Sequence, residues 1–282
     1  MIYCMEKLTN KLVLGTVQFG CQYGINSEGR PDNQMVSEIL REAQNGGITT
    51  LDTSAAYGNA EEVLGKMLAS EKFLIISKYP KSDETVRETF ENTIQCLGCT
   101  KLYGYLLHHF SVYTERKDIW NDFVQLKREG KVEKIGFSLY EPHELDLILN
   151  DGIYFDLVQI PFNIFNRQFE PYFKRLKVMN VEIHARSTFL QGLFFKERNT
   201  LPEKLFPLKP YLIALDDYSK ETGLSIAEIA LNYNIQNPYI DGVLIGVDTK
   251  EQLLANFNSV SEKRIELSIN IKETELLNPV NW

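Results

Sequence analysis

Leu51-Asp52-Thr53-Ser54-Ala55-Ala56-Tyr57-Gly58 is the end of an apolar run that continues directly into ionisable side chains. Ile75-Ile76-Ser77-Lys78 and Tyr105-Leu106-Leu107-His108 have the same form, and Ile135-Gly136-Phe137-Ser138 follows them. The first three segments are strand-like runs that each lead into a polar, ionisable residue. Catalytic groups at the C-terminal ends of successive strands are typical of an α/β barrel.

The rest of the chain supports that fold. Strand-like and helical patterns alternate about eight times, which indicates a parallel sheet. The predicted strands cover residues 12–14, 49–51, 73–76, 102–107, 134–137, 155–160, 181–185 and 242–245. Predicted helices lie between them, including 33–45, 60–70, 83–97, 116–129, 169–179, 211–222, 225–236 and 250–257. No linker or low-complexity tract divides the chain, so we predict a single-domain (β/α)8 TIM barrel over residues 1–282.

Two segments depart from the alternation. Residues 186–210 carry prolines and phenylalanines without a regular period, and we predict an irregular loop over the active site there. Residues 265–271 alternate apolar and polar side chains, which indicates a short strand-like surface segment. The tail from Ser259 to Trp282 gives no signal of its function.

Composition favours a soluble protein that binds a small molecule. Apolar residues make up 44% of the chain and the net charge is −8, so neither nucleic acid nor an anionic membrane is expected as the main partner. The first seven residues lack an apolar h-region and no run of 18 apolar residues occurs, so we expect neither a signal peptide nor a membrane span. Four cysteines form no disulfide framework, which is typical of the cytoplasm. The oligomeric state stays open.

Cys96 and Cys99 form a C-x-x-C motif that has two interpretations. A zinc site would add His108 and His109, but no second C-x-x-C or H-x-x-x-H accompanies the pair. Because the motif lies at the end of a helical pattern, where small buried residues are common, structural packing is favoured over a metal or redox function.

The four ionisable residues suggest proton transfer to a carbonyl, with tyrosine as the acid. Their order resembles the aldo-keto reductase superfamily, over a stretch from about residue 12 to residue 256. The resemblance implies an NAD(P)H-dependent oxidoreductase that reduces an aldehyde or ketone by hydride transfer. It implies Tyr57 as the proton donor and Lys78 as its activating cation. Asp52 would pair with Lys78, and His108 would orient the carbonyl.

Single residues of this set also have ordinary interpretations. Asp52 could cap a turn, Tyr57 could be a loop aromatic and His108 could be a core histidine. Their joint order favours catalysis. His108 is preferred to His109 because strand side chains alternate between faces. A nearby ammonium is expected to make the phenol of Tyr57 more acidic than its ordinary pKa of about 10.

Cofactor binding is implied by the resemblance alone, since no G-x-G-x-x-G motif precedes a helix. Ser138 and Gln159 would hold the nicotinamide carboxamide. Arg186 would stack on the nicotinamide, or else form an ion pair at the barrel rim. The complete implied set is Gly15, Thr16, Asp52, Ser138, Gln159, Arg186, Ser187, Phe189, Gln191, Gly192, Gly246, Asp248, Gln252 and Asn256.

The identity of the cofactor is less clear from the same segment. Relatives that prefer NADP often carry Lys at the position of Gly246 and Arg at that of Gln252, and Asp248 adds a negative charge here. A 2′-phosphate would depend on Thr249, Lys250 and backbone amides. The resemblance favours NADP (NADPH), with NAD as the alternative.

The resemblance of residues 185–192 to enzymes of bacterial sugar and polysaccharide pathways suggests a small-molecule carbonyl substrate that is sugar-like. The predicted pocket rim comprises residues 186–210 with Tyr23, Tyr57, His108, His109, Phe162 and Phe165. Two other functions stay open. Leu139, where the family often has Asn, motivates a cofactor-binding regulatory subunit with little catalysis. A metal-dependent barrel hydrolase would use Asp52 and the two adjacent histidines.

Overall fold

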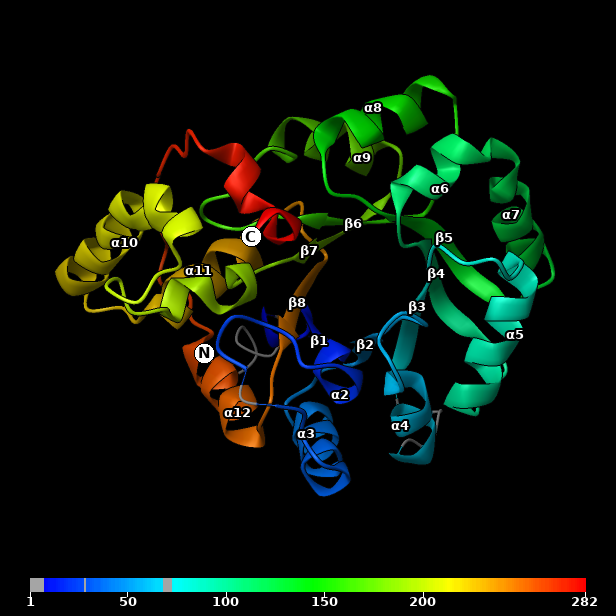
Figure 1. Ribbon diagram of the computed structural model, residues 1–282, viewed down its shortest axis with the longest axis horizontal. Helices are drawn as coiled ribbons and strands as arrows, with labels where there is room; N and C mark the ends of the chain where they lie inside the picture. Colours follow the sequence, from blue (N-terminus) through cyan, green and yellow to red (C-terminus); the bar gives the residue numbers. More distant parts are fainter. Residues whose placement is uncertain (1–7, 28, 68–72) are drawn as a thin grey trace.

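The computed structural model describes residues 8–27, 29–67 and 73–282. Eight parallel strands close into a barrel in chain order, and helices surround it (Figure 1). The strands are β1 Leu12–Gly15, β2 Thr50–Asp52, β3 Leu74–Tyr79, β4 Leu102–Leu107, β5 Val132–Ser138, β6 Leu157–Pro161, β7 Glu182–Arg186 and β8 Gly242–Gly246. The predicted single-domain (β/α)8 barrel is confirmed.

The helices mostly follow the predicted order. They are α2 Val17–Gly20, α3 Asn33–Asn45, α4 Ala60–Met67, α5 Val86–Leu97, α6 Phe110–Glu115, α7 Trp120–Arg128, α8 Pro142–Asn150, α9 Phe173–Val178, α10 Lys209–Thr222, α11 Ile226–Ile235 and α12 Lys250–Ser259. α5 begins later than predicted because Thr85 and Glu88 form a capping box, each side chain accepting the other's backbone N–H. The first seven residues and the predicted end of the helix after Met67 lie outside the described residues.

Three helical predictions were wrong in detail. α6 was not predicted, and the helix predicted over 116–129 begins with a 3₁₀ turn, Lys117–Ile119, before α7. The helix predicted over 169–179 begins with another 3₁₀ turn, Glu170–Tyr172. These starts lack a side-chain N-cap hydrogen bond, so no local sequence signal marks them.

The segment 186–210 lines the cavity through Ser187, Phe189 and Gln191, as predicted for a loop over the active site, but it is not irregular throughout. It contains two 3₁₀ stretches, Leu190–Phe195, which is interrupted by non-helical Gln191 and Gly192, and Glu203–Leu208. Their apolar side chains belong to a second hydrophobic cluster, beside the main core, that also includes residues of α10 and α11. Arg198 donates from Nε and an Nη to the two carboxylate oxygens of Asp216 in α10, at 2.8 and 2.6 Å. Burial and this forked ion pair give the segment an ordered structure, although its sequence has no helical or strand-like hydrophobic pattern.

Residues 265–271 are not a strand either, although their alternation is real. Ile269 and Ile271 are buried in the second cluster, and the polar residues between them face solvent. The segment has no strand partner among the described residues. It packs by its apolar side chains, with further hydrogen bonds from Arg167 to the Ser268 hydroxyl and from the Glu266 N–H to the Tyr218 hydroxyl.

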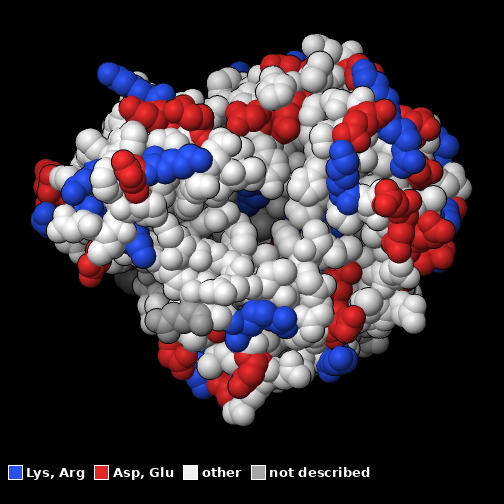
Figure 2. Space-filling model, in the orientation of Figure 1, with Lys and Arg blue, Asp and Glu red and all other residues white. Residues whose placement is uncertain are grey.

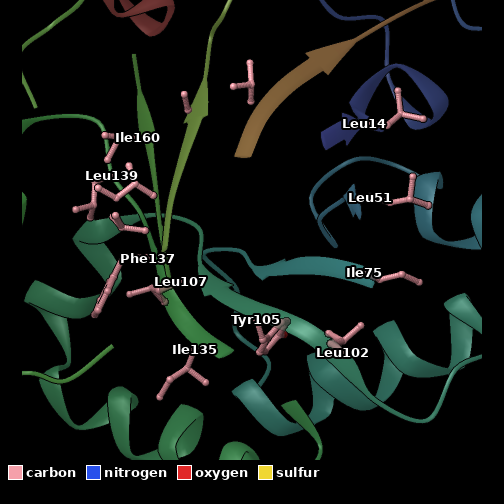
Figure 3. Close-up of a cluster of buried hydrophobic side chains, with 14 of the residues drawn as sticks. Leu14, Leu51, Ile75, Leu102, Tyr105, Leu107, Ile135, Phe137, Leu139 and Ile160 are labelled. Atoms are coloured by element: carbon pink, nitrogen blue, oxygen red, sulfur yellow. The ribbon is translucent and has the colours of Figure 1, made fainter. Parts of the chain in front are cut away.

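Alternating strand side chains separate two apolar regions. Tyr105 and Leu107 of β4 belong to the main core, which lies between the strands and the surrounding helices and appears in part in Figure 3. Leu106 points the other way and fills the barrel interior with Ile76 and Leu157, and all three are fully buried. The polar residues at the C-terminal ends of the strands lie next to this packed apolar interior.

The close approach of β5 and β6 depends on Gly136. A Cβ at this position would lie 1.7 Å from the carbonyl oxygen of Leu157, whereas a Cβ at Gly104 would lie 3.0 Å from the Ile76 side chain. We expect Gly136→Ala to destabilise the fold by more than about 4 kcal/mol, because backbone must move. Gly104→Ala should cost about 1–3 kcal/mol, since a side chain can shift. Urea unfolding of both variants would test this, and equal losses would contradict it.

Candidate active site

Strand alternation brings the candidate residues into the barrel mouth. In β3, β4 and β6 the side chains of Ile76, Leu106 and Leu157 face the interior. The residue two positions later has the same direction. Those residues are Lys78, His108 and Gln159, and Asp52 shares this direction because it pairs in register with Ile76.

Lys78 is the centre of the site. Its ammonium donates to Asp52 Oδ1 at 2.5 Å, to the Thr53 carbonyl at 3.0 Å and to the Tyr57 hydroxyl at 3.3 Å. Its side chain is fully buried and that of Asp52 is 2% exposed. An ammonium has three N–H donors, and these three acceptors use all of them. Gln159 Nε2 donates to the other Asp52 oxygen at 2.8 Å, so that carboxylate is also held on both sides.

The Tyr57 phenol is held in its protonated form. Burial and then the Asp52 carboxylate raise its pKa well above the ordinary value of 10, against a smaller opposing effect of Arg186. The expectation of a more acidic phenol was wrong for this state of the enzyme, because Asp52 balances the charge of Lys78 at contact distance. A phenol that keeps its proton at neutral pH is what a general acid requires.

His108 is a neutral, oriented imidazole. Burial lowers its pKa to about 2, and the charges of Lys78, His109 and Arg186 act in the same direction. Its Nδ1 lies 3.0 Å from Ser54 Oγ, closer than the 3.3 Å between that hydroxyl and the Lys78 carbonyl. The Ser54 hydroxyl has one proton: donated to Nδ1 it places the ring proton on Nε2, and donated to the Lys78 carbonyl it lets Nδ1–H donate to Oγ.

His109 differs from its neighbour as the alternation predicts. Its ring stacks on His108 at 4.7 Å between centroids, while the His108 ring also meets the edge of Tyr57 at 5.6 Å. His109 makes no such contact with Tyr57. Sequence reasoning selected His108 but missed Ser54, whose hydroxyl orients the His108 ring.

A cavity of about 490 Å³ opens beside these residues. It begins at Asp52, Tyr57 and Gln159, passes β1 and β8, and reaches the start of α12. Figure 2 shows the hollow at the centre of this face, with basic atoms inside it. The implied cofactor residues that line it are Gly15, Thr16, Asp52, Gln159, Arg186, Ser187, Phe189, Gln191, Gly192, Gly246, Asp248, Gln252 and Asn256. Ser138 is buried at the end of β5 and is not a lining residue.

Three buried polar atoms in the cavity wall have no hydrogen-bond partner: Gln18 Oε1, Arg186 Nε and Asp248 Oδ1. Unpaired buried polar groups are costly, and a polar ligand would satisfy them. An amide, a guanidinium and a carboxylate spread along an extended cavity fit a dinucleotide, which carries amide, phosphate and ribose groups. Gln18 was missed because nothing in its sequence context marks it.

Arg186 is held by neutral groups. An Nη donates to the Leu139 carbonyl at 2.9 Å, and the guanidinium lies over the Tyr140 ring at 4.1 Å. Among the ion pairs of the described residues none includes Arg186, so the rim ion pair is not found. Position 139 contributes its backbone, since the Leu139 side chain is fully buried. Tyr140 was another residue that sequence reasoning missed.

The turn after β7 has unusual backbone geometry. Ser187, Leu190 and Gln191 have φ values of 61°, 47° and 51°, a left-handed region that costs energy for residues with a Cβ. Ile25 N donates to the Gln191 carbonyl at 3.0 Å, and Asn26 Nδ2 donates to the Gly192 carbonyl at 2.8 Å. The turn is thereby tied to the segment after α2 and exposes its backbone along the cavity.

Two predicted rim aromatics lie elsewhere. Phe162 is fully buried against Phe173 and Tyr233, and Phe165 is buried against Phe194. Both are taken into the hydrophobic clusters because helices α9 and α11 and the 3₁₀ segment cover them. The prediction that they line the pocket mouth was wrong.

The alternative sites find little support in the described part of the chain. No group of three or more His, Cys, Asp or Glu side chains there could hold a metal ion. Both oxygens of Asp52 accept hydrogen bonds, from Lys78 and Gln159, so the carboxylate of the hydrolase alternative already has two partners. Burial raises the pKa of the Cys96 and Cys99 thiols, which makes them less reactive.

No helix in the described ranges is long and apolar enough to span a membrane.

Comparisons with known proteins agree with this geometry. The family model described as the Aldo/keto reductase family matches residues 11–270. The uncharacterized oxidoreductase YqkF of Bacillus subtilis is 23% identical over 286 residues, covering 91% of this chain and 90% of the relative. Glyoxal reductase of Bacillus subtilis is 25% identical over 211 residues, covering 71% and 70%. An aldo/keto reductase structure from Klebsiella pneumoniae, in complex with NADP and acetate, superposes with a TM-score of 0.66 at 18% identity, covering 96% and 91%.

The buried ion pair makes a prediction about stability. Lys78→Met should cost about 3–5 kcal/mol of unfolding free energy, because it leaves the Asp52 charge buried without its cation. Adding Asp52→Asn should recover much of that loss. Lys81→Met is the matched control, since Lys81 and Glu115 are also 2.5 Å apart but are 60% and 57% exposed. If Lys78→Met and Lys81→Met gave the same urea midpoint, the assigned role of the buried pair would be wrong.

His108 should make stability depend on pH. Its folded pKa of about 2 lies below the unfolded value near 6.5, so the unfolded chain binds a proton that the folded chain refuses between these values. This contribution is complete above pH 6.5 and is lost as the pH falls, at about 1.4 kcal/mol per pH unit. We expect His108→Gln to flatten the dependence. Urea titrations at pH 7, 6 and 5 measure it, and parallel curves for both proteins would refute the expectation.

Proposed function

The chain belongs to the aldo/keto reductase family and is an NAD(P)H-dependent oxidoreductase, and we propose that it reduces an aldehyde or ketone to the alcohol with Tyr57 as the proton donor. One observation carries the proposal: Lys78 bridges the Asp52 carboxylate and the Tyr57 hydroxyl, and both of these residues line a cavity of about 490 Å³ that reaches the start of α12. A phenol beside a fixed ammonium can release its proton to a carbonyl oxygen as charge develops there.

Each residue has a part that follows from its surroundings. A nicotinamide bound in the cavity supplies the hydride. Tyr57 keeps its proton until a carbonyl oxygen gains negative charge, because burial and Asp52 hold its pKa high. Lys78 then stabilises the phenolate from 3.3 Å, and Asp52 keeps the ammonium in place. His108 is neutral, and its tautomer with the proton on Nε2 can donate a hydrogen bond that orients the carbonyl.

The substrate is proposed to be a small carbonyl compound. Similarity to glyoxal reductase supports that class. A sugar-like substrate is the finer proposal, and it rests on the resemblance of residues 185–192. Tyr23, Phe189 and Phe195 line the cavity beside polar groups, a combination that suits the apolar face and hydroxyls of a sugar. The resemblance implies NADP as the cofactor, with NAD as its alternative.

A regulatory subunit that binds the cofactor without useful catalysis is the second candidate. The loss of the family Asn at Leu139 and the altered segment after β8 favour it. The complete hydrogen-bond set around Lys78 argues for retained chemistry, since a buried charge network is costly to keep without use.

Tyr57→Phe tests the two candidates. It removes only the hydroxyl, so we expect reduction of glyoxal-type and sugar aldehydes to fall by at least about 100-fold. Cofactor binding, followed by fluorescence quenching, should change little. Tyr154→Phe is the control, because Tyr154 is 62% exposed and bonds only Asp156 at the outer surface. Wild-type protein that binds a reduced cofactor but turns over no carbonyl would support the regulatory subunit instead.

A further inference from the structure

The ends of the cavity can be told apart by chemistry. The hydride and the proton of Tyr57 must reach the same carbonyl, so the nicotinamide end of any bound cofactor lies beside Tyr57. The adenosine end therefore lies at the far end of the cavity, which β8 and the first turns of α12 line through Asp248, Gln252 and Asn256.

Asp248 is an unsatisfied acceptor at this outer end. Its Oδ1 is buried and has no hydrogen-bond partner in the described chain. Burial raises the pKa of the carboxyl. Its backbone N–H is already used, since it donates to Gln252 Oε1 at 2.7 Å. The side chain therefore needs a donor from a ligand, and a ribose hydroxyl is such a donor.

The lysine that could pair with a phosphate here is engaged elsewhere. Lys250 Nζ forms an ion pair with Glu38 of α3 at 2.5 Å, and α3 and α12 lie side by side in Figure 1. Thr249 Oγ1 accepts from the backbone N–H of Gln252 at 3.2 Å as the N-cap of α12. Among the described residues that line the cavity Arg186 is the single basic one, and it lies at the other end, over Tyr140.

We infer that the cavity is selective for NAD(H) over NADP(H), with Asp248 as the specificity-determining residue. The carboxylate accepts a hydrogen bond from a hydroxyl of the adenosine ribose, and its negative charge opposes a 2′-phosphate in the same place. The inference rests on the proposed function only in that a nicotinamide cofactor occupies the cavity. It reverses the NADP preference that the family resemblance implies.

Binding of the two reduced cofactors to the full chain tests this without turnover. NADH and NADPH differ only in the 2′-phosphate, so calorimetric titration of each isolates that group. We expect NADH to bind at least about tenfold more tightly to the wild type, given the strength of hydrogen bonds to charged groups. Asp248→Asn, which keeps the shape and removes the charge, should reduce this preference by roughly tenfold or more.

Glu251→Gln is the matched control. Glu251 is the adjacent exposed acid in the first turn of α12, outside the cavity lining, so its removal should leave the NADH-to-NADPH ratio unchanged. Competition by 5′-AMP and by adenosine 2′,5′-bisphosphate repeats the comparison without the nicotinamide, and 5′-AMP should be the better competitor.

Tighter binding of NADPH by the wild type would overturn the inference and leave the proposed reductase standing. An unchanged ratio in Asp248→Asn, or an equal change in Glu251→Gln, would overturn the role of Asp248. Binding of neither dinucleotide would refute the proposed function and this inference together, so the two failures are distinguishable.

Discussion

The buried pair of Lys78 and Asp52 is the interaction on which the site depends. Two opposite charges at 2.5 Å, both removed from water, persist only where further groups complete their hydrogen bonds. The closed barrel supplies those groups from two strand ends: Thr53 and Tyr57 from the turn after β2, and Gln159 from β6. A barrel brings these ends together because its parallel strands all finish at one edge, so the ion pair and the fold require each other.

Burial then sets the protonation of the two groups beside the pair. It raises the pKa of Tyr57 and lowers that of His108, and in both cases the neutral form is retained. The cation does not acidify the phenol beforehand, because the carboxylate already balances it. The ammonium stabilises negative charge on the phenol oxygen only once the phenol loses its proton. The site thus holds two neutral hydrogen-bond donors near one ammonium, an arrangement suited to stabilising an oxygen that becomes negative.

Local sequence was sufficient for the parts of the structure that local forces determine. Apolar side chains on one face and a Gly-Gly stop predicted residues 33–45, the bounds of α3, and strand alternation separated His108 from His109. Non-local contacts decided the rest. Gln18 enters the site from the short helix α2 and Tyr140 from the loop after β5, and the left-handed Gln191 follows from ties to the segment after α2. Segment 186–210 is ordered by burial against α10, and no periodic pattern in its own sequence indicates that contact.

The net charge of the chain also differs in meaning from the charges that line the cavity. The net charge of −8 affects which partners the whole surface attracts or repels. A molecule bound in the cavity meets only the groups that line that cavity. Those groups are uneven, with Arg186 towards the reacting end and Asp248 at the far end. The sequence shows Lys250 next to Asp248 and would allow it to neutralise the carboxylate or bind a phosphate. The structure directs that lysine to Glu38 on another helix, so the negative charge of Asp248 stays uncompensated in the place where the second ribose of a dinucleotide would lie.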